Sequence, residues 1–233
     1  MKKCFSSLFA LVLCICMVCP VWASSFVPSI SYKPGPSIVT KPGDDDRELI
    51  GEIVDENGNP VSKEYTDCII ITPVGDAETS DRISEENKDT LLKVYDELKN
   101  GDVKLSDIFP EGKDYVIKDL FDLTGVCDDI KENLPKPGYT IDLTFDIGVD
   151  ADVPVKVMVY LNGEWVVLDN VINNGDGTIT CTFEDFCPVA IMVPANTVKT
   201  GDESGVMMWA IVALVSFVAM LGMVVVYRRK VVK

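Results

Sequence analysis

The sequence predicts an α+β protein: a β-rich ectodomain that ends in an antiparallel β-sandwich, followed by one transmembrane helix. Residues 139–195 contain short segments of alternating polarity separated by turn signals, which is typical of a β-sandwich. Residues 47–138 mix short apolar runs with an amphipathic helical pattern. Residues 206–227 form a run of 22 residues without a formal charge, which is long enough to cross a bilayer.

The N-terminal residues have the pattern of a secretory signal. Lys2 and Lys3 precede an apolar stretch, and we expect cleavage after Ala23, so that residues 1–23 are removed. Residues 24–46 predict an extended linker, because four prolines, two glycines and a run of three aspartates oppose packing.

Residues 47–138 predict an α+β region that begins with a strand, a turn and a second strand. Residues 49–54 predict the first strand, and the Asn57-Gly58 pair predicts a tight turn before the chain resumes at Val61. We prefer this turn to a calcium loop, because the alternating ligands and the closing glutamate of such a loop are missing. Residues 68–71 predict a short buried strand.

The amphipathic helix of this region is predicted between a capping serine and a glycine. Ser84 is the expected N-cap and Gly101 the expected stop. The apolar face repeats at helical spacing and consists of Leu91, Val94, Tyr95 and Leu98. Residues 115–123 then predict a strand, and residues 128–134 predict a further helical turn.

The sandwich module, residues 139–195, has the most regular pattern. Residues 140–147 alternate strictly, with Ile141, Leu143, Phe145 and Ile147 on one side. Strands are also expected at residues 155–161, 164–168, 178–183 and 189–193. Asn162-Gly163 predicts a two-residue hairpin turn. For Trp165, which follows that turn, core packing is favoured over stacking on a sugar ring.

The C-terminal residues predict a membrane anchor. A helix over residues 206–227 would span roughly 33 Å, and a hydrocarbon core is about 30 Å thick. Residues 228–233 form a basic tail that is expected on the cytoplasmic side, which places the ectodomain outside the cell. Residues 196–205 link the sandwich to this helix.

The charge of the ectodomain excludes some partners. Of the 21 Lys and Arg, 15 lie between the signal and the tail, against all 37 Asp and Glu, which gives this part a net charge of −22. Such a surface repels nucleic acid. The chain has no histidine, which excludes His-ligated metals and Ser-His-Asp or Cys-His catalysis. We therefore expect no catalytic residue, metal site or cofactor.

Four cysteines remain after removal of the signal: Cys68, Cys127, Cys181 and Cys187. An exported chain can form disulfides, and four cysteines allow three pairings, between which their spacing does not choose. In a tight hairpin turning at residues 184–185, Cys181 and Cys187 would point to opposite faces, which argues against that pair. Buried free thiols are the alternative.

Two stretches resemble cell-surface proteins of Gram-positive bacteria. Residues 176–190, Asp-Gly-Thr-Ile-Thr-Cys-Thr-Phe-Glu-Asp-Phe-Cys-Pro-Val-Ala, resemble the final Ig-like β-module of such proteins. Lys199-Thr200-Gly201-Asp202-Glu203-Ser204, with the apolar helix and Arg228-Arg229-Lys230, resembles their cell-wall sorting signal.

The second resemblance implies a sortase that cuts the Thr200-Gly201 bond and transfers the threonine carbonyl to peptidoglycan. The family pattern is Leu, Pro, any residue, Thr, Gly, whereas this chain has Thr197-Val198-Lys199-Thr200-Gly201. Val198 stands in place of the proline. Covalent wall attachment and a retained membrane anchor both stay open.

Three functions are compatible with these patterns. The first is a non-catalytic surface protein that displays an acidic ectodomain, in an adhesive or structural role, with a glycan or host protein as ligand. The second is an enzyme that cleaves envelope polysaccharide with a carboxylate pair. The third is a ligand-free stalk subunit, which should expose no large apolar patch.

Overall fold

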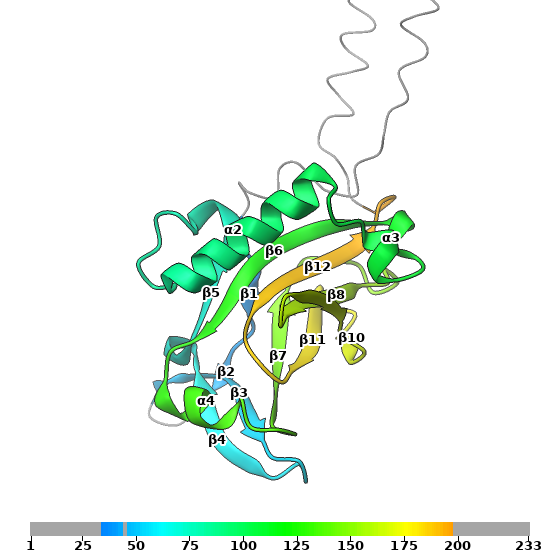
Figure 1. Ribbon diagram of the computed structural model, residues 1–233. Helices are drawn as coiled ribbons and strands as arrows, with labels where there is room; N and C mark the ends of the chain where they lie inside the picture. Colours follow the sequence, from blue (N-terminus) through cyan, green and yellow to red (C-terminus); the bar gives the residue numbers. More distant parts are fainter. Residues whose placement is uncertain (1–33, 44–45, 198–233) are drawn as a thin grey trace, which may run out of the picture. The chain divides into compact units, whose positions relative to one another are not determined.

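The structure is a computed structural model that describes residues 34–43 and 46–197. These residues form two antiparallel sheets and a few helices, which confirms the β-rich α+β class (Figure 1). The strands are β1 (Ser37–Ile38), β2 (Lys41–Pro42), β3 (Glu48–Val54), β4 (Pro60–Tyr65), β5 (Ile69–Pro73), β6 (Tyr115–Gly125), β7 (Thr140–Asp146), β8 (Lys156–Leu161), β9 (Glu164–Val167), β10 (Val171–Asn173), β11 (Thr178–Phe183) and β12 (Pro188–Pro194). The helices are α2 (Glu85–Asn100), α3 (Leu105–Ile108) and α4 (Asp128–Asn133), and 3₁₀ turns lie at η3 (Thr66–Cys68), η4 (Val74–Asp76) and η5 (Gly112–Asp114).

We call the two sheets A and B. Sheet A has the order β5-β6-β12-β8-β9, and sheet B has the order β10-β11-β7-β3-β2, with β1 also paired to β7 and β4 to β3. Strands of residues 47–138 pair with strands of residues 139–195 in both sheets: β6 with β12 in sheet A, and β3 with β7 in sheet B. Both regions thus belong to one compact unit, which extends to Ala195.

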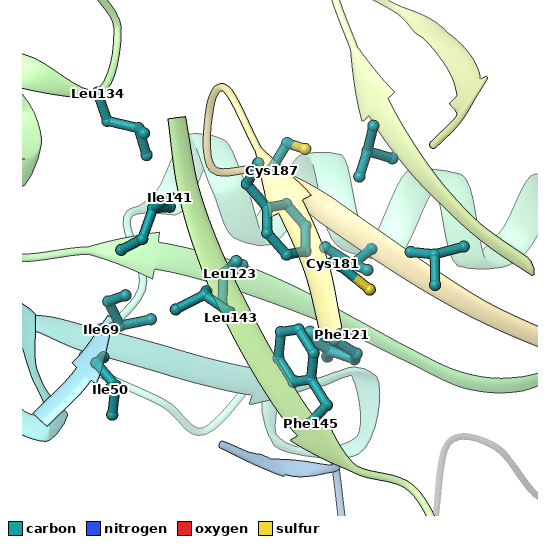
Figure 2. Close-up of a cluster of buried hydrophobic side chains, with 14 of the residues drawn as sticks. Ile50, Ile69, Phe121, Leu123, Leu134, Ile141, Leu143, Phe145, Cys181 and Cys187 are labelled. Carbon is teal, nitrogen blue, oxygen red and sulfur yellow. The ribbon is translucent and has the colours of Figure 1, made fainter. Parts of the chain in front are cut away.

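The main core lies between the two sheets, where the inward side chains of both gather (Figure 2). The alternation predicted for residues 140–147 is confirmed, because Ile141, Leu143 and Phe145 are buried while the intervening residues of β7 are not. Phe145 packs against Phe121 of sheet A, with ring centroids 5.8 Å apart, and against Phe183, at 6.0 Å. The contact between Phe145 and Phe121 joins the two sheets into a sandwich.

A second core lies on the other face of sheet A, beneath α2 (Figure 1). The predicted helix is confirmed with both of its ends: the Ser84 hydroxyl accepts a hydrogen bond from the Asn87 N–H, and Gly101 is left-handed at φ 75°. The predicted apolar face is the buried one, and it packs on side chains of β6, β8 and β12. Successive residues of β12 therefore face different cores, because Val189 points to sheet B and Ala190 to α2.

Two predicted turns are confirmed by their backbone. Asn162 and Gly163 have φ of 53° and 89° between β8 and β9, as the Asn-Gly hairpin turn requires. Between β3 and β4, the Asp55 carboxylate accepts hydrogen bonds from the N–H groups of Asn57 and Asn59, both at 2.9 Å. Asp55 thus closes a turn with its own side chain.

Two expectations differ from the structure. Residues 178–183 and 188–194 are not a hairpin, because β11 lies in sheet B and β12 in sheet A, so the segment between them crosses from one sheet to the other. Cys181 and Cys187 consequently point into the same core instead of to opposite faces (Figure 2). Within the stretch interpreted as a linker, residues 37–38 and 41–42 pair with β7 and β3.

The signal segment with Ala23, the sorting-like residues Thr200 and Gly201, the apolar run 206–227 and the tail 228–233 lie outside the described residues. Within residues 34–43 and 46–197, no helix has the length and apolarity needed to cross a bilayer.

Candidate ligand-binding sites

A crease runs across the outer face of sheet B, at the place where β3 leaves β7. β3 begins between β2 and β4 and pairs with β7 only at its last two residues, Ile53 and Val54. Gly51 allows β3 to approach β7 closely, because a Cβ at this position would lie 2.8 Å from the Asp142 carbonyl oxygen. The crease has a volume of about 700 Å³ and is lined by Val39, Lys41, Leu49, Ile50, Gly51, Glu52, Val54, Asp142, Thr144, Asn174, Asp176, Thr178 and Thr180.

Hydrogen bonds hold the polar wall of the crease in place. The Thr144 and Thr180 hydroxyls are 2.9 Å apart across β7 and β11. The Asn174 amide donates to the hydroxyls of Thr178 and Thr180, at 2.9 Å and 3.0 Å. Asp176 accepts from the Thr178 hydroxyl at 2.6 Å, and this bond lowers the pKa of the Asp176 carboxyl. The wall is therefore an ordered array of hydroxyl, amide and carboxylate groups.

The sequence does not predict a binding site here, although it predicts part of the polar wall. The alternation of β7 and β11 places their threonines on the outward side, and the Asn, Gly and Asp residues at 173–177 predict a turn. Neither pattern predicts that Lys41, Leu49 and Glu52 complete the opposite wall, because that depends on where β2 and β3 pair.

A second cavity, of about 270 Å³, lies between the sheets near the end of β11. We call it the end cavity. Its lining includes apolar side chains of β8 and β9 together with residues 168–170 and 182–185. Residues 168–170 connect β9 to β10, and residues 182–185 comprise the end of β11 and the start of its connection to β12; both connections carry the chain between the sheets.

Asp122 of β6 carries a buried carboxyl group that contacts Asn87 of α2. Its side chain accepts hydrogen bonds from the Thr124 hydroxyl and, at 3.5 Å, from the Asn87 amide, while its Oδ1 atom has no hydrogen-bond partner. Burial raises the pKa of this group to about 6, against the two hydrogen bonds, which lower it. Thr124 and Asn87 line a neighbouring pocket of about 230 Å³, but Asp122 does not.

Asp122 is poorly suited to act as one of a pair of catalytic carboxylates. Its residue is 0% exposed, and a glycosidase acid must reach the glycosidic oxygen of its substrate. No pattern in the sequence reveals this residue, because the strand around it is buried on both faces.

Of Cys68, Cys127, Cys181 and Cys187, the first two are joined by a disulfide. The sequence had left this bond open as one of the possible pairings. Cys181 and Cys187 are buried free thiols. Burial raises the pKa of each of these two thiols to about 12, so neither supplies a thiolate nucleophile near neutral pH.

Trp165 packs against the core beneath α2. Its ring centroid lies 5.3 Å from that of Tyr160 in an edge-to-face arrangement, and its indole nitrogen is buried. This agrees with the core packing favoured for Trp165 over stacking on a sugar.

The part of the chain that the structure describes contains no group of three or more Asp, Glu, Cys or His side chains placed to hold a metal ion.

No family model, curated protein or solved structure matches this chain.

Proposed function

We propose that this protein is a non-catalytic surface protein of a Gram-positive bacterium, which displays an acidic β-sandwich outside the cell and binds a neutral glycan in the crease of sheet B. The observation that carries the proposal is the crease itself, a hollow of about 700 Å³ with ordered hydroxyl and amide groups on an otherwise exposed face.

The charge of the crease supports a neutral ligand. Glu52, Asp142 and Asp176 line it, against a single basic residue, Lys41. Excess negative charge repels sialylated or sulfated sugars. The hydroxyl groups of a neutral sugar can both donate and accept hydrogen bonds, and the aliphatic side chains of Val39, Leu49 and Val54 can contact its C–H groups.

The disulfide supports export. Disulfides persist in oxidising compartments and are rare in the cytosol. The Cys68–Cys127 bond therefore fits a chain that carries a signal sequence and has its ectodomain outside the cell.

A binding screen tests the adhesive role. Cells displaying the protein are exposed to an array of neutral, amino and acidic glycans, with mucins and matrix proteins included. We expect binding to neutral sugars, and about a tenfold loss in the Thr144→Val/Thr180→Val variant, because the hydroxyl array is removed. The matched control is Thr79→Val, an exposed threonine between η4 and α2.

The outcome of the screen separates the alternatives. Binding that the crease variant does not change would refute the crease as the site. A protein that binds nothing would leave the stalk function, which is compatible with the few large apolar side chains exposed among the described residues: Val61, Val166 and Ile172. Release of sugar fragments from envelope polysaccharide would instead favour the carboxylate enzyme.

Cell fractionation with a muramidase step tests the anchor. Release of the protein as a ladder linked to peptidoglycan means that sortase has used the Thr200-Gly201 bond. Extraction by detergent alone means that residues 206–227 remain as a membrane helix. A full-length protein that is freely dissolved in the cytosol would refute surface display.

A further inference from the structure

The end cavity combines an apolar interior with an acidic rim. Val159 and Phe183 are buried in the main core and form part of its wall, together with the half-buried Leu161 and Leu168. Asp169, Glu184 and Asp185 also line the cavity and are exposed. The carboxylates thus lie where the apolar space meets water.

The rim carries no compensating positive charge. The residues that line the end cavity include these three acids and no Lys or Arg. By contrast, Lys41 lines the crease, and Lys131 lines the pocket beside Asn87. Among these three hollows, the end cavity is the one whose lining contains acidic residues and no basic residue, which favours a cation.

Because the acidic rim adjoins an apolar wall, the cavity favours an organic cation over an inorganic ion. A small inorganic ion would leave the apolar wall unfilled, whereas an aliphatic chain that ends in an ammonium group can contact both parts. The chain would displace water from Val159, Leu161 and Phe183, while the ammonium group stays hydrated near the carboxylates. Each methylene that is buried strengthens binding roughly fourfold.

We propose that the end cavity binds an aliphatic ammonium group, supplied by a lysine side chain of a polypeptide or by a free alkylamine. The end cavity shares no lining residue with the crease, so this proposal does not depend on the proposed glycan binding.

Methyl NMR of the full-length protein in nonionic micelles tests the proposal. The probes are pentylammonium, pentanol and pentanoate, which share one alkyl chain and differ in charge. We expect saturable shifts at the methyl groups of Val159, Leu161 and Leu168 with pentylammonium. Pentanol should bind about tenfold more weakly, and pentanoate should not saturate.

Two double variants test whether the rim carboxylates are responsible for the preference for the ammonium probe. Asp169→Asn/Asp185→Asn should weaken pentylammonium binding about tenfold and reduce its salt dependence, because Glu184 alone then remains on the rim. The control Asp96→Asn/Asp102→Asn removes two exposed acids, one in α2 and one just beyond it. It should change neither the affinity for pentylammonium nor the salt dependence of binding. Methyl chemical shifts that match those of the unmodified protein, measured without ligand, confirm that both variants fold.

The proposal is overturned if pentanol or pentanoate binds as tightly as pentylammonium, or if the rim variant binds the ammonium probe unchanged. A lysine residue blocked at both termini, N-acetyl-lysine N-methylamide, distinguishes the source. Tighter binding of this probe than of pentylammonium identifies a polypeptide partner, and the opposite order identifies a free amine.

Discussion

The outer faces of the two sheets differ in what covers them. On sheet A, α2 buries the outward side chains of β6, β8 and β12 in a second apolar core. On sheet B, the outward residues of β7 and β11 are threonines and aspartates that remain half-buried or exposed. A strand buried on both faces serves stability, whereas a strand with one polar face can carry a ligand site.

The amino-acid pattern of the strands accounts for this difference. In β12, the run from Pro188 to Val193 is buried without interruption, which is typical of a strand covered on both faces. In β7, buried and accessible residues alternate, as expected for a sheet with one solvated face. The contrast between the two faces predicts how the molecule responds to substitution.

The largest effect should come from breaking the disulfide. Cys68 and Cys127 are 59 residues apart, and the segment that they enclose contains α2, α3 and β6. Cys68→Ser/Cys127→Ser should lower the free energy of unfolding by roughly 4 kcal/mol, because the unfolded chain gains conformational freedom. Denaturant titration measures this loss, and a reductant should reproduce it in the unmodified protein.

Hydrogen exchange should show which sheet depends more on the disulfide. We expect the amides of α2 and β5 to lose more protection in this variant than those of β7 and β11, since only the former lie in the enclosed segment. An equal loss in both sheets would show that the sandwich opens as one unit.

The next effect should come from the cover of sheet A. Leu91 of α2 is 0% exposed, and Leu91→Ala should cost about 2–5 kcal/mol through lost contacts and the cavity left behind. Asp96→Ala, on the exposed side of the same helix, should change stability by less than about 0.5 kcal/mol. Similar losses in the two variants, measured by denaturant titration, would contradict the packing of α2 on sheet A.

At Asp122 we expect a substitution to increase stability, by a smaller amount than the losses above. Its pKa rises from 3.8 to about 6 on folding, so the folded state holds this proton more tightly than the unfolded state. The resulting stability is fully present below about pH 4 and is lost as the pH rises through about 6. Asp122→Asn keeps both hydrogen-bond acceptor contacts and removes the buried charge.

Asp122→Asn should therefore be more stable than the unmodified protein at pH 8, by up to about 3 kcal/mol, and the difference should shrink toward pH 4. Unfolding curves at several pH values measure it. A difference that does not change with pH would mean that the carboxyl titrates normally.

The smallest effect is expected on the open face of sheet B. Thr180→Val removes a half-buried hydroxyl that bonds to Thr144 and Asn174, and should cost under about 1 kcal/mol, because water reaches this face. Thermal unfolding measures the change. A loss as large as that of Leu91→Ala would mean that the threonine array supports the fold and is not a free surface.

The local elements of this protein follow from residues that are close together in the chain. Ser84 and Gly101 mark the ends of α2, and Asn162-Gly163 marks the hairpin between β8 and β9, because capping and positive φ depend on the residues at those positions. The alternation in β7 likewise identified Ile141, Leu143 and Phe145 as core residues.

The pairing of the strands, and the cavities that form between them, depend on how the whole chain packs. Antiparallel pairing between residues far apart depends on packing across the whole core, so no local pattern places β12 beside β6 or separates β11 from it. The crease, the end cavity and the burial of Asp122 all arise where such distant segments meet. For the same reason, the sequence left three disulfide pairings open where the structure contains the Cys68–Cys127 bond.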